Sequence, residues 1–66
     1  MLDNRLQTFL TLCEQGSFTK TAEILNMTQP AVSQHIQYLE HYYQIILIAE
    51  KGKNFSLTEE GKALQQ

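Results

Sequence analysis

The chain of 66 residues is long enough for one small domain, and its 42 % hydrophobic and 18 % charged residues are typical of a folded domain. One cysteine excludes an intrachain disulfide and a multi-cysteine metal site, and no apolar run approaches the ~20 residues of a membrane span. The formal net charge of −2 argues against strong non-specific attraction to nucleic acid. We therefore expect a cytoplasmic protein.

The first apolar pattern predicts a helix over residues 2–15. Leu6, Phe9 and Cys13 recur at helical spacing, and Gly16 follows at the usual place of a left-handed C-cap. We interpret Cys13 as a small buried hydrophobic residue.

A second, shorter helix is predicted over residues 20–25, with Ser17 or Thr19 as its N-cap. Ile24 and Leu25 are expected to supply its core contacts.

A turn over residues 26–28 joins this helix to the next, because Asn26 tolerates the left-handed conformation better than most residues. Two helices joined in this way form a helix-turn-helix arrangement. The third helix is predicted over residues 28–42, with Thr28 as N-cap and Pro30 in the first turn, where a missing N–H costs nothing.

This third helix has two different faces when residues are placed at about 100° per step. The apolar stripe consists of Val32, Ile36, Leu39 and Tyr43. The opposite face consists of Pro30, Ser33, Gln34, Gln37, Tyr38 and His41, with Gln29 near the boundary at the helix end. Neutral donor–acceptor side chains suit base edges, and Gln can bond adenine through two contacts. The helix is therefore predicted to read the DNA major groove.

A β-branched apolar run at residues 45–48 predicts a strand, and residues 55–57 alternate as the returning strand. Residues 51–54 between them are rich in the residues that turns require. The resulting hairpin would be a wing, whose Lys51 and Lys53 are placed to touch phosphate or to reach the minor groove.

Thr58 is the predicted N-cap of a final helix, with Glu59 and Glu60 in its first turn, where the helix dipole favours acids. No stop signal follows, so we expect this helix to continue in a longer protein. The predicted fold class is mostly α: a winged helix-turn-helix with a three-helix core, a two-stranded β-hairpin wing and the start of a fourth helix.

The sequence resembles the N-terminal winged helix-turn-helix domain of LysR-type transcriptional regulators. The most specific matches are Gly16-Ser17-Phe18-Thr19, Thr28-Gln29-Pro30-Ala31-Val32-Ser33, and Leu57-Thr58 with Gly61. The resemblance implies a winged helix-turn-helix domain at residues 1–58 and the start of a dimerisation linker helix at 59–66. It also implies a bacterial, nucleoid-associated homodimer or higher homo-oligomer that binds double-stranded DNA at an inverted-repeat operator. A missing C-terminal domain would bind a small co-inducer.

The resemblance further implies which residues contact DNA. Those at bases or the adjoining backbone would be Gln29, Pro30 and Ser33, with Gln34 and Gln37 beside them. Those at phosphate would be Thr19, Lys20 and Thr28 from helix N-termini, and Lys53 from the wing. No catalytic, metal-binding or cofactor-binding residue is expected in this chain.

Several positions depart from the family pattern. Where the family usually has Leu-Phe-x-Arg, this chain has Leu47-Ile48-Ala49-Glu50, and arginines common on the third helix are replaced by Gln34, Gln37 and Tyr38. Fewer cations predict a shallower salt dependence and weaker binding per half-site. Gln44 stands where glycine normally ends the helix, and its positive φ would cost on the order of 1 kcal/mol.

An alternative is a winged-helix module that binds protein without sequence-specific DNA binding. It is favoured by the acidic balance, by Glu50, and by the apolar Ile46 close to Tyr42 and Tyr43. Unaltered binding partners after Gln29→Ala would favour this alternative.

An enzyme is not expected. His35 and His41 lie outside the i, i+4 spacing of a zinc-binding helix, and no Glu or Cys joins them. We also predict that the chain by itself is monomeric or weakly dimeric, because the family dimerises through the truncated final helix. A two-fold dimer would set two recognition helices ~34 Å apart on DNA.

Overall fold

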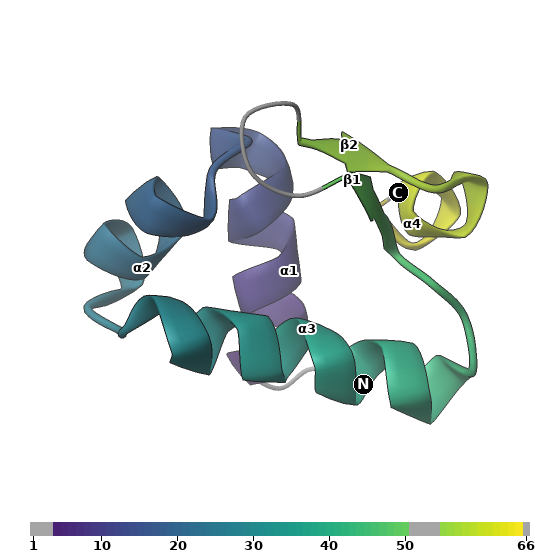
Figure 1. Cartoon of the computed structure of the whole chain (residues 1–66), viewed down its shortest axis with the longest axis horizontal. Helices are drawn as coiled ribbons and strands as arrows, with labels where there is room; N and C mark the ends of the chain where they lie inside the picture. Colours follow the sequence, from purple (N-terminus) through teal and green to yellow (C-terminus); the bar gives the residue numbers. More distant parts are fainter. Residues whose placement is uncertain (1–3, 51–54, 66) are drawn as a thin grey trace.

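A computed structural model describes residues 4–50 and 55–65, which form helices and one antiparallel pair of strands. The elements are α1 (Asn4–Gln15), α2 (Phe18–Leu25), α3 (Gln29–Tyr43), β1 (Ile48–Glu50), β2 (Ser56–Leu57) and α4 (Glu59–Gln65). Figure 1 shows α3 along one edge of the molecule, with α2 beside its N-terminal end and the sheet and α4 over its C-terminal half. This architecture confirms the predicted fold class. Among the described residues, no helix is both long and apolar enough to cross a membrane.

One hydrophobic core joins the helices to the hairpin. Its buried residues are Phe9, Leu12, Ile36, Leu39, Leu47 and Ile48. The apolar stripe predicted for α3 is confirmed, because Val32, Ile36 and Leu39 are at most 1 % exposed and Tyr43 packs against the core. Burying each such side chain contributes about 1.5–3 kcal/mol. The core therefore fixes the rotation of α3 about its axis and leaves its opposite face outward.

The second helix begins earlier than predicted. Ser17 is its N-cap, because the Ser17 hydroxyl accepts a hydrogen bond from the Lys20 N–H at 3.1 Å. Helix α2 consequently starts at Phe18 and not at Lys20. Asn26 ends it with a φ of 57°, as predicted for this turn.

Thr28 caps the third helix, because its hydroxyl accepts a hydrogen bond from the Ala31 N–H at 3.3 Å. Each end of α3 lies one residue later than in the predicted range 28–42. Gln44 follows with a φ of 57°, which confirms that a non-glycine residue holds the left-handed position.

One prediction about buried side chains is wrong, and a second is met only in part, since Cys13 packs against the core without being fully buried. Ile24 was expected in the core but is 57 % exposed. The buried residues of α2 are Thr21 and Ala22, and Ile24 points about 200° around the helix from Ala22. Cys13 is only half-buried, because the adjacent Leu12 takes the position that faces the core.

The first strand also starts later than predicted. Strand β1 pairs with β2 at Ile48 opposite Leu57, whereas residues 45–47 form an irregular link from α3 to the sheet. One carboxylate oxygen of Glu40 accepts hydrogen bonds from the N–H groups of Leu47 and Ile48, at 2.9 and 3.4 Å. The backbone N–H of Leu47 therefore donates to a side chain of α3 and not to a neighbouring strand.

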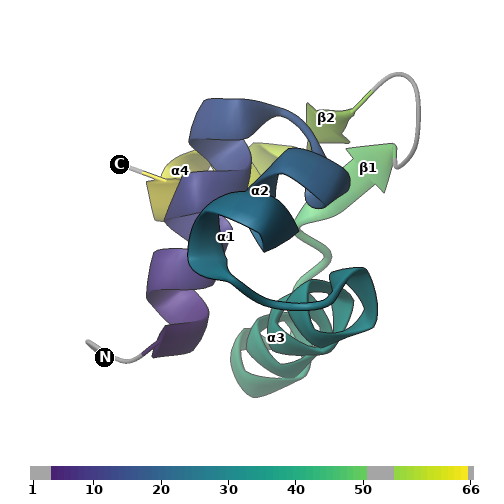
Figure 2. The ribbon, with the colours of Figure 1, turned by 90° about the vertical axis from the view of Figure 1, so that its left-hand side faces the viewer.

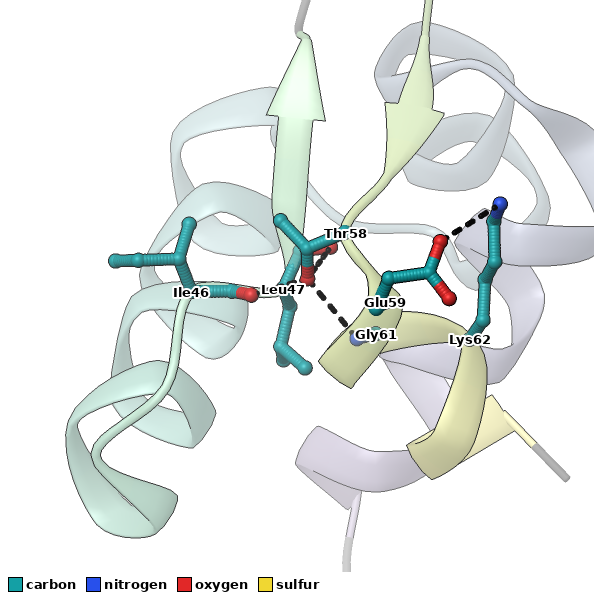
Figure 3. A network of polar contacts seen from close by, with 6 residues as sticks. All are labelled: Ile46, Leu47, Thr58, Glu59, Gly61 and Lys62. Carbon is teal, nitrogen blue, oxygen red and sulfur yellow. Dashed lines mark hydrogen bonds and ion pairs between the residues drawn. The ribbon is translucent and has the colours of Figure 1, made fainter.

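Helix α4 is joined to this link through Thr58 (Figure 3). The Thr58 N–H donates to the Leu47 carbonyl at 2.9 Å, and its hydroxyl donates to the Ile46 carbonyl. The same hydroxyl accepts from the Gly61 N–H at 3.0 Å, which confirms Thr58 as the cap of α4. A Cβ atom at Gly61 would collide with the Leu47 carbonyl oxygen, so the close approach of α4 requires glycine.

Candidate nucleic-acid interface

The face of α3 opposite the core is largely open to solvent. Its exposed residues are Gln29, Pro30, Gln34, Gln37, Tyr38 and His41. Ser33 is half-buried, since it lies only about 100° from the buried Val32. The predicted outward face is therefore confirmed, and it presents amide, hydroxyl and imidazole groups with no acidic residue among them.

The N-terminal ends of α2 and α3 meet at one end of this face. The Gln29 side-chain nitrogen Nε2 donates a hydrogen bond to the Thr19 hydroxyl at 3.3 Å, and both side chains are exposed. Lys20 and Thr28, the next residue along α2 and the cap of α3, are exposed as well. Figure 2 faces this side of the molecule, with α2 in front of α1 and above α3. Helix N-termini carry partial positive charge, so their meeting point favours an anion such as phosphate.

Cations are sparse at this interface. Lys20 lies where α2 and α3 meet, whereas Lys62 on α4 pairs with Glu59 at 3.5 Å. Lys51 and Lys53, predicted for the wing tip, lie outside the described residues. Among the described residues, the cations close to α2 and α3 are therefore Lys20 and Arg5, whose guanidinium lies near Tyr38 of α3.

The flank of α3 that faces α1 carries contacts that the sequence did not reveal. The Arg5 guanidinium lies over the Tyr38 ring, 3.9 Å from its centroid. Thr8 Oγ and His35 Nδ1 are 2.9 Å apart, and the Thr8 hydroxyl also donates to the Asn4 carbonyl at 2.8 Å. Because a hydroxyl has one hydrogen, His35 Nδ1 must be the donor to Thr8. His35 thus lies between α3 and α1 with a defined ring orientation.

Large apolar side chains are exposed at the C-terminal end of α3 and just after it. Ile46 is 61 % exposed and Tyr42 is 57 % exposed, whereas Tyr43 packs against the core. Tyr42 also stacks on Tyr38, with ring centroids 6.1 Å apart. Tyr42 therefore borders the outward face of α3 at its C-terminal half.

Neither a metal-ligand group nor a reactive cysteine is found among the described residues. Residues 4–50 and 55–65 contain no group of three His, Cys, Asp or Glu side chains that could hold a metal ion. Burial, and secondarily the negative charge of Glu14, raises the pKa of the Cys13 thiol to about 11. Cys13 is therefore protonated at neutral pH and is a poor nucleophile.

Comparison with known proteins finds this domain in transcription regulators. A family model described as bacterial regulatory helix-turn-helix protein, lysR family, matches residues 4–62. An uncharacterized HTH-type transcriptional regulator of Azotobacter vinelandii is 44 % identical over 59 residues, which cover 89 % of this chain and 41 % of that protein. The chain spans about two fifths of that relative's length and about a fifth of the length of several other curated relatives.

Solved structures show the same architecture. A LysR-family transcriptional regulator from Eggerthella lenta is 51 % identical, with a TM-score of 0.90 over 98 % of this chain and 93 % of that chain. DarR from Vibrio fischeri, solved in complex with DNA, is 35 % identical, with a TM-score of 0.86 over 98 % of this chain and 23 % of that chain.

Proposed function

The chain belongs to the lysR family of bacterial regulatory helix-turn-helix proteins, and on this premise we propose that it binds operator DNA with α3 in the major groove. The observation that carries the proposal is the outward face of α3, where exposed glutamines provide paired donors and acceptors. A face kept open for solubility alone would favour Lys and Glu. Amide groups at helical spacing instead match the donors and acceptors of base edges.

Base contacts are assigned to the N-terminal half of α3. Gln29, Pro30 and Ser33 approach the bases or the adjoining backbone, and Gln34 and Gln37 extend the contact along the groove. A glutamine that bonds adenine through two contacts contributes about 1–3 kcal/mol of discrimination against the wrong base. Because Ser33 is half-buried, its hydroxyl can contact only those DNA groups that come close to the helix.

Phosphate contacts are assigned to the point where α2 and α3 meet. Thr19, Lys20 and Thr28 surround the two helix N-termini, each of which carries roughly half a positive charge. These contacts set the position of the domain on the duplex without reading sequence. Lys51 and Lys53 would add contacts from the wing.

We infer that the domain acts as part of a homodimer on an inverted repeat. Its net charge of −2 and the small number of cations near α3 make binding of one copy to one half-site weak. Two copies related by a two-fold axis would present two α3 helices to successive major grooves.

Fluorescence anisotropy of this chain, and of a version with the full linker helix, on duplexes selected from a random pool tests this function. We expect one inverted repeat to be enriched, and Gln29→Ala to weaken its binding about fivefold or more. The matched control is Gln65→Ala, because Gln65 is exposed on α4, which packs against α1 and β2 away from the α3 face. If the pool yields no preferred sequence, or if both variants bind like the original chain, α3 does not read DNA.

A further inference from the structure

Gln29 is held by a side chain of another helix before any DNA is present. Its Nε2 atom donates to the hydroxyl of Thr19, which lies in the first turn of α2, at 3.3 Å. Both residues are exposed, so the hydrogen bond lies on the surface that would face the duplex. The contact links a residue assigned to phosphate with a residue assigned to bases.

The chemistry of the two groups limits how this contact forms. The Gln29 nitrogen has two hydrogens, and the bond to Thr19 uses one of them. The other hydrogen and Oε1 remain to bond a base. Adenine requires one donor to its N7 atom and one acceptor for its N6 amino group, which are the two atoms that this orientation of the amide leaves available.

Phosphate binding makes this orientation the favoured one. A phosphate oxygen only accepts hydrogen bonds, so a Thr19 hydroxyl that contacts phosphate must donate its single hydrogen to it. The Thr19 oxygen can then only accept from Gln29. If the amide turned over, Oε1 would face the Thr19 oxygen with no hydrogen between them, and the contact would become repulsive.

We propose that Thr19 is a positioning residue that sets the orientation of the Gln29 amide. When Thr19 contacts phosphate, this orientation gives Gln29 its preference for adenine. This inference rests on the proposed function, because it requires α3 to lie in the major groove. It assigns Thr19 a part in sequence choice, whereas a phosphate contact alone would strengthen binding to every sequence equally.

The test compares Thr19→Val, which removes the hydroxyl and keeps the branched shape, with Thr19→Ser, which keeps the hydroxyl. The base pair read by Gln29 is first identified as the one whose preference disappears in Gln29→Ala. Affinities are then measured for the four duplexes that differ only at this base pair. Thermal unfolding of each variant establishes that the fold is intact, as expected for an exposed residue that does not cap α2.

We expect Thr19→Val to reduce the preference for adenine at this base pair by about fivefold or more, and Thr19→Ser to retain most of it. The inference is overturned if Thr19→Val weakens all four duplexes by the same factor, or changes none of them, while the original chain still selects its operator. If the original chain selects no sequence, the proposed function fails, and this inference fails with it.

Discussion

The carboxylate of Glu40 on α3 accepts a hydrogen bond from the backbone N–H of Leu47 at 2.9 Å, and Leu47 is fully buried. The helix proposed to read DNA is thus joined by its own side chain to the link that precedes the wing. We expect this contact to help hold the hairpin in place relative to α3.

Glu40→Ala should destabilise the fold by about 1–3 kcal/mol, because it leaves the buried Leu47 N–H without its acceptor. Urea unfolding followed by circular dichroism measures this change. Glu23→Ala is the matched control, since Glu23 is exposed on α2 and its removal should change stability by less than about 0.5 kcal/mol. Equal stabilities of the two variants would mean that the Glu40 contact does not hold the link.

Gly61→Ala should destabilise the protein by about 1–3 kcal/mol, because the added methyl group would overlap the Leu47 carbonyl oxygen. The direction of the stability change is informative, since Gly→Ala in a helix without such a contact stabilises the protein by about 1 kcal/mol. Differential scanning calorimetry gives the change in Tm. A rise in Tm would contradict the close approach of α4 to the link.

Gln44→Gly should stabilise the fold by up to about 1 kcal/mol, because glycine accepts a φ of 57° without the steric penalty that glutamine has. The paired control is Gln37→Gly within α3, which should cost about 1 kcal/mol. Chemical unfolding of both variants tests the prediction, and losses of similar size at the two positions would argue against a strained Gln44.

Lys20→Ala should lower the slope of log Kd against log salt by about 0.9, the value expected for one lost phosphate contact on B-DNA. Lys62→Ala should leave the slope unchanged, because Lys62 is on α4 and pairs with Glu59. Anisotropy titrations of the selected operator at several salt concentrations provide the slopes. The assignment of Lys20 to phosphate would be withdrawn if the two variants had equal slopes.

The cap of α3, the left-handed ends of α2 and α3, and the direction in which α3 faces followed from local chemistry, whereas the start of α2 was predicted two residues late. A capping side chain bonds a backbone N–H up to three residues away, and an apolar stripe repeats within one helix. Both features can therefore be predicted from residues that are close in the sequence. Thr28, Asn26 and Gln44 adopt the conformations that their positions predicted. The outward face of α3 was predictable for the same reason.

Contacts between residues far apart in the chain were decided only by the tertiary structure. The exposure of Ile24 depends on which face of α2 the core covers, and the start of β1 at Ile48 depends on a carboxylate from α3. The contact between Thr19 and Gln29 needs two helices in a fixed relation. Residue type alone did not predict these features, because each depends on packing that the whole core imposes. The sequence by itself thus determined which helix presents an outward face of amide and hydroxyl groups, and the folded structure decided what holds those groups in place.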